Sequence, residues 1–400
     1  MSQPVLSLFK GYGIEIEYML VERQTLKVSP VCDKVITSLA GETVNEFEMG
    51  PVAISNELAN HVIELKTNGP AGSLENLAED FHTATLKIES TAQNFGATLL
   101  GTGMHPTMIP ANDTQLWPHG QSEIYSAYDA IFGCKGHGWS NLQSVHINLP
   151  FANDEEFFLL HNAIRAILPL IPALSASTPV CESKFAANKD QRLKIYSENQ
   201  KIVPQITGVV IPESIHNAAE YEQVIFEPMY AQMRKKFNAD HLCHEWLNSR
   251  GAIARFDRNA IEIRVIDTQE SAKANLSVVK AVVNAVQFFS KPEFASLAET
   301  LDQQLLVQTF WNCVQFGSQC VTSPLTEKLM PQAQSQKTAR DFWQFFLPAD
   351  EKFSEVYLRQ GTLAERIVAN YPERETSKEQ IITIYRQLNN CLFSNSVFEL

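Results

Sequence analysis

Acidic side chains interrupt an apolar, strand-forming segment near the start of the chain. Glu15 and Glu17 lie two residues apart in KGYGIEIEYMLV (residues 10–21). Because side chains two apart on a strand share a face, both carboxylates should point the same way. Two like charges side by side are unfavourable unless something neutralises them. The segment therefore raises the question of which cation these carboxylates face.

Four further segments place polar residues within apolar, strand-like runs. They contribute Glu57 and Glu64 in SNELANHVIELK, His146 and Asn148 in SVHINLP, Arg255 in IARFD, and Glu262 and Arg264 in AIEIRVID. A solvated sheet face also alternates, but it usually mixes Lys, Thr, Ser and Gln. This set consists almost wholly of Glu, His, Asn and Arg, which are residues that bind metals and anions.

The residue types indicate a particular chemistry. Glutamates with one histidine match the hard ligands that suit Mg²⁺ or Mn²⁺. The sequence lacks the cysteine cluster that would indicate a zinc site. Arginines on the same strands suit phosphate oxygens or a carboxylate. Phosphoryl transfer needs this combination, whereas no P-loop and no glycine-rich dinucleotide turn is present. The pattern alone leaves two interpretations open, a metal-dependent phosphate site and a polar sheet face.

The elements that would position these residues alternate along the first 270 residues. We expect strands at 12–21, 61–67, 97–103 and 143–149, and two strands within 252–267 joined by a turn around 257–260. One amphipathic helix should begin after Ser73 and end at Gly96, and another should span 154–168. Beyond residue 271 the pattern is mostly helical. This order predicts an α+β fold with a largely antiparallel sheet.

Composition narrows the class of protein. The 400 residues are 44% hydrophobic and carry a net charge of −13, without a Lys/Arg cluster that would bind nucleic acid. No segment has the roughly 18 apolar residues of a membrane span, and no secretory signal is visible. The seven cysteines are scattered, with no CxxC pair, which predicts reduced thiols in a cytoplasmic protein.

Six motifs, in order over about residues 11–270, resemble the glutamate–cysteine ligase family. They are GIEIEY (13–18), NELANHVIELKT (56–67), GTGMHP (101–106), SVHINLP (144–150), IRAILPLIPALSASTP (164–179) and AIARFDRNAIEIRVIDTQE (252–270). More broadly, they resemble the carboxylate–amine ligases, whose fold looks like the catalytic domain of glutamine synthetase.

The resemblance implies a fold and an activity. The fold would be α+β, with a curved, largely antiparallel sheet of glutamine-synthetase-like type and helices packed on one face. Residues 1–400 would form one catalytic domain, with an ATP- and metal-binding core at 1–270 and a helical layer at 271–400. The enzyme would use ATP and Mg²⁺ to form an acyl phosphate that an amine attacks. In the name-giving case, glutamate and cysteine give γ-glutamylcysteine, which suggests a role in glutathione synthesis.

The resemblance also implies roles for individual residues. The metal ligands would be Glu15, Glu17, Glu57, Glu64, His146 and Glu262. Arg264 would contact the transferring phosphoryl group, with Glu262 and Arg255 as further catalytic residues and Arg258 as a second nucleotide contact. Arg165, Arg192 and Tyr196 match positions that hold the amino-acid substrate. Which glutamate binds which ion stays open.

Three alternatives remain at this point. A ligase of the same family could use a different acid or amine, a non-catalytic relative could bind ATP or an amino acid as a sensor, and a metal-dependent hydrolase could use the same carboxylates without ATP. We expect amino acids and ATP as small-molecule partners, with neither nucleic acid nor membrane. Whether the chain forms a homo-oligomer stays open.

Overall fold

The structure, a computed structural model, describes residues 5–120, 122–332, 337–349, 351–371 and 376–400. Within these ranges ten strands form one eight-stranded sheet and one two-stranded ribbon. The strands are β1 (Gly13–Glu22), β2 (Glu46–Glu48), β3 (Val52–Asn56), β4 (Val62–Thr67), β5 (Ala97–Leu100), β6 (Ser144–Pro150), β7 (Val180–Cys181), β8 (Lys184–Phe185), β9 (Ala252–Arg255) and β10 (Ala260–Asp267).

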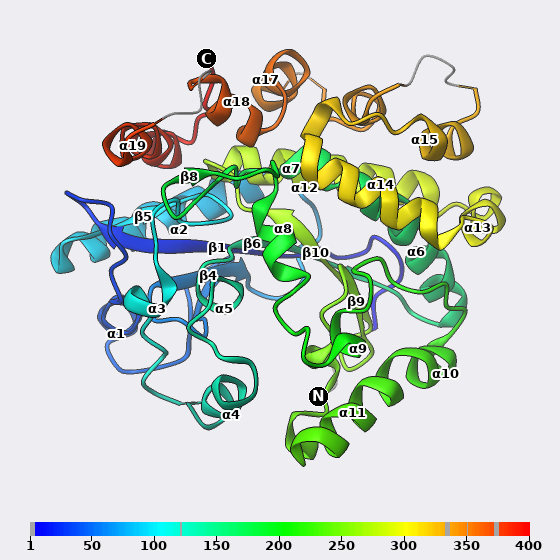
Figure 1. Cartoon of the computed structure of the whole chain (residues 1–400), viewed down its shortest axis with the longest axis horizontal. Helices are drawn as coiled ribbons and strands as arrows, with labels where there is room; N and C mark the ends of the chain where they lie inside the picture. The colour runs from blue at the N-terminus through cyan, green and yellow to red at the C-terminus, as the bar shows by residue number, and fades with distance from the viewer. Residues whose placement is uncertain (1–4, 121, 333–336, 350, 372–375) are drawn as a thin grey trace.

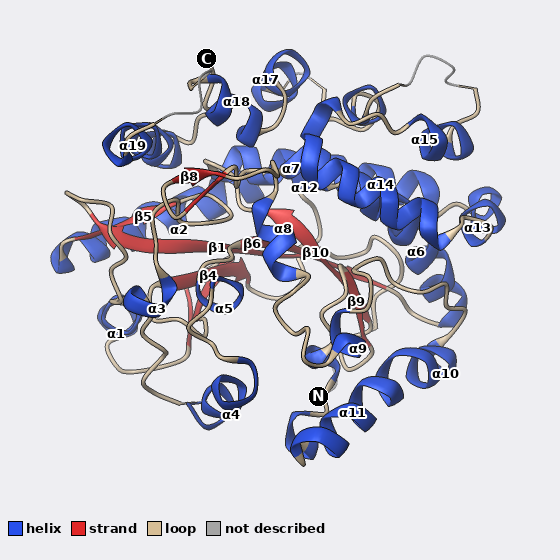
Figure 2. Ribbon diagram, viewed as in Figure 1, coloured by secondary structure: helices blue, strands red, loops and turns tan. Residues whose placement is uncertain are grey.

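The main sheet is centred on β1 (Figure 2). Its order is β2-β3-β4-β1-β6-β10-β9, and every pairing is antiparallel. On one edge β1 pairs with β4; on the other its first half pairs with β6 and its second half with β5. The predicted antiparallel sheet and the predicted β9–β10 hairpin are therefore confirmed. The sequence did not predict β2 and β3, which extend the sheet beyond β4.

Nineteen α-helices occur in the same ranges, and Figure 1 shows how the labelled ones lie around the sheet. They are α1 (Cys32–Ala40), α2 (Leu77–Ala92), α3 (Pro110–Asp113), α4 (Ser122–Phe132), α5 (His137–Ser140), α6 (Asp154–Ile167), α7 (Pro172–Ser175), α8 (Gln191–Tyr196), α9 (Pro204–Thr207), α10 (Ala218–Tyr221), α11 (Glu227–Phe237), α12 (Ala272–Phe289), α13 (Pro292–Glu299), α14 (Gln303–Phe316), α15 (Ser323–Leu329), α16 (Ala339–Trp343), α17 (Lys352–Gln360), α18 (Leu363–Ala369) and α19 (Lys378–Ser394). Since the described segments beyond residue 271 contain helices and no strand, the predicted helical C-terminal third is confirmed.

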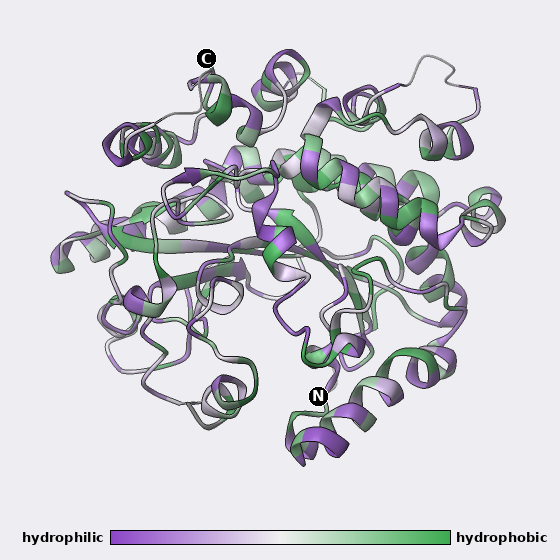
Figure 3. Ribbon diagram, viewed as in Figure 1, coloured by the Kyte–Doolittle hydropathy of each residue, from purple (hydrophilic) through white to green (hydrophobic). Residues whose placement is uncertain are grey.

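One face of the sheet is apolar and forms the main core. Ile14, Ile16 and Tyr18 alternate along β1 and are fully buried in a cluster that includes apolar side chains of α2, α6 and α12. Figure 3 shows the strands as mostly hydrophobic, whereas the peripheral helices mix polar and apolar turns. Side chains at i, i+2 and i+4 of a strand share a face, which is why this alternation builds the core. The helical layer predicted for one face is present.

The opposite face is divided between two environments. Glu15 and Glu17 project from the first half of β1, but Met19 and Val21 continue the same face as buried apolar residues. These two belong to a second core with side chains of α18 and α19, such as Leu388. The C-terminal helices thus cover one half of this face, in addition to the predicted layer on the other face, and leave the acidic half for a site.

The predicted boundaries of α2 are only partly correct. The helix begins at Leu77, after Asn76 with φ 64°, and not directly after Ser73. Its C-terminal end passes through a 3₁₀ turn at Gln93–Phe95 and stops at Gly96, whose φ of 70° suits glycine. The predicted C-terminal end of the helix is therefore confirmed, whereas the predicted N-terminal start is wrong.

Two further findings concern the predicted class. In the described ranges, no helix combines the length and apolar character needed to cross a bilayer. All seven cysteines lie in these ranges and are free, as the scattered spacing predicted.

Candidate active site

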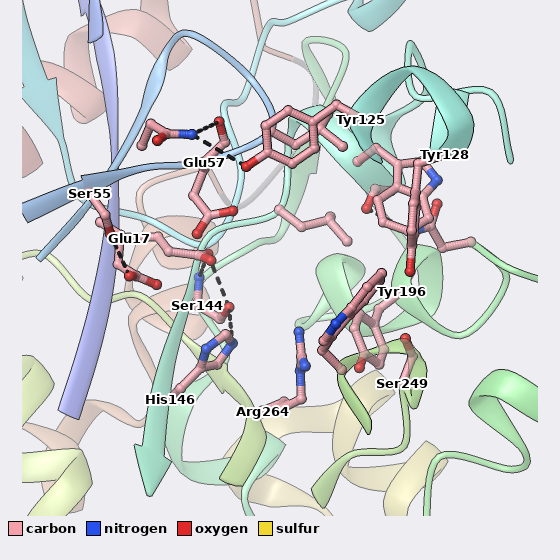
Figure 4. Close-up of a pocket in the computed structure, with 18 of the residues that line it drawn as sticks. Glu17, Ser55, Glu57, Tyr125, Tyr128, Ser144, His146, Tyr196, Ser249 and Arg264 are labelled. Carbon is pink, nitrogen blue, oxygen red and sulfur yellow. Dashed lines mark hydrogen bonds between the residues drawn. The ribbon is translucent and has the colours of Figure 1, made fainter. Parts of the chain in front are cut away.

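A cavity of about 590 Å³ lies over the acidic half of the sheet. Its floor comes from β1, β4, β6 and β10, and its walls come from segments near α4, α5 and α8 and from the β9–β10 turn. Nine of the residues proposed from the sequence line it: Glu17, Glu57, Glu64, His146, Arg192, Tyr196, Arg255, Arg258 and Arg264. Figure 4 shows Glu17, Glu57 and His146 on one side and Arg264 and Tyr196 on the other.

Strand register explains why residues far apart in sequence meet here. Glu17 pairs with Glu64 across β1 and β4, and Glu15 pairs with His146 across β1 and β6. Directly opposed residues of antiparallel strands point to the same face. Glu262 on β10 lies opposite Asn148 and so completes the row. The alternation seen in the sequence is thus assembled into one polar surface.

The six predicted metal ligands form two groups of three. In each group one ligand atom per residue lies within 4.8 Å of the others. We call Glu17, Glu57 and Glu64 the glutamate triad, and Glu15, His146 and Glu262 the histidine triad. Their donor set of five carboxylates and one imidazole is the set that Mg²⁺ or Mn²⁺ prefers. The residues therefore fit divalent ions, and the arrangement can hold cations beside an anionic substrate.

The glutamate triad concentrates negative charge in a buried place. Burial, and then the charges of Glu64 and Glu17, raise the pKa of Glu57 well above its usual value. Burial and the charge of Glu15 raise the pKa of Glu64 to about 7, although Ser55 donates a hydrogen bond of 2.8 Å to its carboxylate. A cation placed among these oxygens would relieve both effects.

The histidine triad is stabilised by neighbouring groups of the protein. His146 Nδ1 lies 3.0 Å from Glu15 Oε2, and Glu262 is 3.3 Å from Arg264 Nη1 and 3.5 Å from Arg255 Nη1. Burial alone would raise the pKa of Glu15, but the hydrogen bond and charge of His146 lower it to about 2. Burial alone would lower the pKa of His146, but Glu15 raises it.

Ser144 connects the two triads. Its backbone N–H donates to Glu17 Oε2 at 2.7 Å, and its hydroxyl lies 3.1 Å from the same oxygen and 2.9 Å from His146 Nε2. These contacts, drawn in Figure 4, fix the Glu17 carboxylate and the imidazole relative to each other. A residue that the sequence did not single out thus orients one member of each triad.

The arginines proposed for phosphate chemistry lie on β9, β10 and their turn. Burial would lower the pKa of Arg264, but Tyr196 and Glu262 raise it, so the guanidinium stays charged. Its Nε is buried without a hydrogen-bond partner among the described residues. Arg255 pairs with Glu262 and with Asp257 at 3.2 Å. Arg258 is exposed at the rim of the cavity, where it can meet an incoming anion.

Arg192 and Tyr196 lie one turn apart on α8. The helix begins after Asp190, whose carboxylate accepts a hydrogen bond of 2.9 Å from Leu193 N–H. Arg192 pairs with Asp267, and the Tyr196 hydroxyl donates to the carbonyl of Arg250 at 3.4 Å. Residues four apart on a helix share a face, so both can contact the same ligand.

Arg165 lies elsewhere, so its assignment to the substrate is corrected. It is on α6, which packs on the apolar side of the sheet, and only 3% of it is exposed. Its guanidinium donates to Pro212 O at 3.1 Å and to Gln303 Oε1 at 2.6 Å, and it does not belong to the described lining of the cavity. Arg165 thus joins α6 to neighbouring segments and has a structural role.

An aromatic wall that the sequence did not predict closes one side of the cavity. We give this name to Tyr125, Tyr128, Trp139 and Trp246. The ring of Tyr128 is 5.1 Å from Trp139 and 5.7 Å from Trp246 between centroids. Trp139 lies in FGCKGHGWS (residues 132–140) and Trp246 in HLCHEW (residues 241–246), and in the sequence only their aromatic character could have indicated that these segments line a site. Tyr128, Trp139 and Trp246 give this side of the cavity an aromatic surface, whereas Tyr125 lies beside Glu57 and its hydroxyl accepts a hydrogen bond of 3.3 Å from Asn56 Nδ2.

Comparisons with known proteins identify the family to which the chain is related. A family model described as glutamate-cysteine ligase family 2 (GCS2) matches residues 12–302. An uncharacterized protein of Archaeoglobus fulgidus is 36% identical over 369 residues, which are 92% of this chain and 95% of that protein. A Bradyrhizobium protein provisionally named glutamate–cysteine ligase 2 is 23% identical over 321 residues, or 78% of this chain and 70% of that one.

One solved structure shows a similar fold. It is the glutamate–cysteine ligase of Francisella tularensis in complex with AMP, with a TM-score of 0.55 at 13% identity. The superposition covers 96% of this chain and 89% of that chain. At this identity the likeness concerns the fold alone, and it agrees with the mixed architecture predicted from the sequence.

Proposed function

The chain belongs to glutamate–cysteine ligase family 2, and on this basis we propose that it is an ATP- and Mg²⁺-dependent carboxylate–amine ligase. The observation that carries the proposal is that the two triads share one sheet face with Arg264, which contacts Glu262 at 3.3 Å and lines the same cavity as the glutamate triad and His146. Hard ligands and arginines on a common floor suit the transfer of a phosphoryl group. The AMP in the Francisella ligase supports the assignment of an adenine nucleotide.

The metal ligands in this proposal are the two triads. Glu17, Glu57 and Glu64 would hold one ion, and Glu15, His146 and Glu262 would hold another. An ion held there would supply positive charge to neutralise the phosphate oxygens. Ser144 keeps Glu17 and His146 oriented toward these positions through its hydrogen bonds.

The arginines act on the anionic groups of the substrates. Arg264, held against Glu262, would stabilise the negative charge on the transferring phosphoryl group. Arg255 would keep Glu262 in place from its other side, and Arg258 at the rim would contact the nucleotide. Arg192 and Tyr196 would bind the amino acid that is phosphorylated.

The first pair of substrates that we propose is glutamate and cysteine. The γ-carboxylate of glutamate attacks the γ-phosphorus of ATP, and ADP leaves with the electrons of the broken P–O bond. The cysteine amine then attacks the carbonyl carbon of the acyl phosphate, and phosphate leaves as the amine loses a proton. The product, γ-glutamylcysteine, would serve the synthesis of glutathione or another thiol in the cytoplasm.

The aromatic wall favours a second candidate within the same class. Tyr125, Tyr128, Trp139 and Trp246 line the cavity together, so an amine with a larger apolar or aromatic group would find aromatic side chains to pack against. The Archaeoglobus relative is described without an activity, so the similarity to it does not indicate which amine is the substrate.

Phosphate release from Mg·ATP tests both candidates. The assay is run with glutamate, with and without cysteine, and then with a panel of acids and amines, and products are identified by mass spectrometry. Cysteine-dependent release with the mass of γ-glutamylcysteine would support the first candidate. Release only with a bulkier amine would replace it by the second. If no acid or amine of the panel leads to phosphate release, the ligase assignment is refuted and a sensor is favoured. Hydrolysis of a panel compound in the absence of ATP would indicate a metal-dependent hydrolase.

A further inference from the structure

A fully buried carboxylate lies at the end of the strand that carries Glu262 and Arg264. Asp267 is the last residue of β10 and is 0% exposed. Its Oδ1 accepts a hydrogen bond of 2.5 Å from Arg192 Nε. Its Oδ2 accepts from Ser177 N–H at 2.8 Å and from the Thr178 hydroxyl at 3.0 Å. Both oxygens are thus engaged, and only one of them holds a charged partner.

A β-bulge brings Asp267 to the same side of the sheet as Arg264. Between β10 and β6, Ile263 pairs with Ile147 and Ile266 pairs with Val145, so β10 contains one extra residue. In a regular strand, residues three apart point to opposite faces. Because the bulge inserts one extra residue, Asp267 and Arg264 point to the same face instead. The bulge also frees the carbonyl of Arg264, which accepts from Arg192 Nη2 at 3.3 Å.

Arg192 is therefore held along one edge of its guanidinium. Nε and Nη2 contact Asp267 and the bulge carbonyl, and the backbone N–H of Arg192 donates to Thr178 Oγ1 at 3.1 Å. Nη1 makes no hydrogen bond to any described residue. Arg192 is only 1% exposed, yet it belongs to the lining of the cavity. A buried guanidinium fixed on one edge and open on the other is suited to bind a planar anion.

We propose that Asp267 is a positioning residue, which orients Arg192 so that its open edge binds the carboxylate of the acid substrate. The inference rests on the proposed function, because it assigns an amino-acid carboxylate to this edge. Asp267 does not contact the substrate; it acts through Arg192. The close approach at Gly103 supports a tightly defined geometry, since a Cβ there would lie 2.8 Å from Asp267 Cγ.

A neighbouring aspartate provides a matched control. Asp190 is also 0% exposed and near Arg192, but it caps α8, and the ion pair of the guanidinium is with Asp267. Burial and the charge of Asp267 raise its pKa well above the usual value. Asp190→Asn keeps an oxygen that can accept the hydrogen bond from Leu193 N–H, whereas Asp267→Asn removes the carboxylate that holds Arg192 Nε.

The test compares the KM for L-glutamate with the KM for ATP in Asp267→Asn, Asp190→Asn, Arg192→Lys and the double variant Asp267→Asn/Arg192→Lys. We expect Asp267→Asn to raise the glutamate KM about tenfold or more, with the ATP KM changed less than about twofold. Asp190→Asn should match the wild type. In the Arg192→Lys background, Asp267→Asn should add little, because the two residues act as one unit. An unchanged glutamate KM in folded Asp267→Asn, or an equal loss in Asp190→Asn, would overturn the inference.

A milder pair of variants covers the case in which Asp267→Asn does not fold. Thr178→Val removes the hydroxyl between Asp267 and Arg192 without a change of charge, and Thr178→Ser keeps it. We expect Thr178→Val to raise the glutamate KM a few-fold (roughly threefold) and Thr178→Ser to behave as the wild type. Equal values for both would contradict the positioning role.

Equilibrium binding separates this inference from the proposed function. If the wild type turns over no substrate, calorimetric titration with L-glutamate is compared between wild type and Asp267→Asn. Binding that is weakened in the variant would support the inference while the ligase assignment fails. Equal binding in both proteins, or no binding of glutamate to the wild type, would refute it.

Discussion

The histidine triad and the glutamate triad lie side by side on one sheet face, but their charges are stabilised differently. Glu15 has His146 at 3.0 Å, and Glu262 has two arginines within 3.5 Å. Among the described residues, the ion pair of the glutamate triad is between Lys66 Nζ and Glu64 Oε1 at 3.7 Å. Lys66 Nζ also pairs with Glu46 Oε2, outside the triad, at the shorter distance of 2.7 Å. Accordingly, the pKa of Glu15 falls to about 2, because His146 outweighs burial, whereas burial and Glu15 raise that of Glu64 to about 7.

This difference indicates a division of labour within one site. His146 and the two arginines place positive charge beside the carboxylates of the histidine triad, so we expect that group to keep its geometry with or without an ion. The glutamate triad is strained by like charges until a cation arrives from outside. We infer that the glutamate triad makes the site depend on metal, while the histidine triad and its arginines hold a rigid frame.

The largest expected effect is on catalysis and involves one glutamate from each triad. Glu17→Gln and Glu262→Gln should each lower ATP turnover by about 10²–10³-fold, because each removes a charge that acts at the phosphoryl group. Circular dichroism and thermal unfolding should show folded proteins. Glu48→Gln, an exposed position on β2, is the control and should keep full activity. Normal turnover in both triad variants would refute the assigned site.

The next effect is on stability, and here the two triads should differ in sign. Without metal at pH 8, Glu64→Gln should stabilise the protein by up to about 3 kcal/mol, because the folded pKa of about 7 lies above the unfolded value near 4.5. Glu15→Gln should destabilise it by up to about 3 kcal/mol, because the folded pKa of about 2 lies below the unfolded value. Urea unfolding in EDTA measures both.

The pH dependence checks the sign of each change. The cost of ionised Glu64 appears as pH rises from about 4.5 to about 7, so the gain from Glu64→Gln should vanish below that window. The stability that Glu15 contributes is present above about 4.5 and is lost as pH falls toward 2. Changes of the same sign at pH 8 would contradict the contrast between the triads.

Adding metal should reverse the disadvantage of the glutamate triad. At a Mg²⁺ concentration of about 100 times the dissociation constant, we expect the wild type to gain about 2.7 kcal/mol. Glu64→Gln should lose most of this gain, whereas Glu15→Gln should retain more of it, because the glutamate triad is the group that needs an external cation. NaCl at equal ionic strength is the control. A gain with NaCl equal to that with MgCl₂ would mean that screening, and not binding, is responsible.

The sequence predicted the floor of the site well, because the relevant signal is local. Alternation of Glu15 with Glu17 and of Glu262 with Arg264 identifies a strand face without knowledge of its partners. The antiparallel register then brings Glu64 and His146 beside them. Prediction of the fold class succeeded for the same reason, since strands and long helices each leave a periodic pattern.

The sequence failed where position depends on packing or irregular backbone. Arg165 stands near a helix end, but only the packing of α6 determines that it faces away from the cavity. Asp267 was not predicted as a site residue, because strict alternation would place its side chain on the other face of the sheet from Arg264. The β-bulge that brings both side chains to one face has no clear pattern in the sequence. The aromatic wall joins segments that are distant in the chain, so no local pattern marks Tyr128 and Trp246 as neighbours.

The smallest expected effect concerns Lys66, the cation beside the glutamate triad. Its side chain is 26% exposed, and its charge acts at 3.7 Å from Glu64, so partial screening limits its influence. Lys66→Met should tighten Mg²⁺ binding about threefold, because a bound ion would no longer meet a positive charge. Lys201→Met, at an exposed position, is the matched control. Calorimetric titration with MgCl₂ measures the difference, and weaker binding in Lys66→Met would mean that Lys66 supports the metal site instead of competing with it.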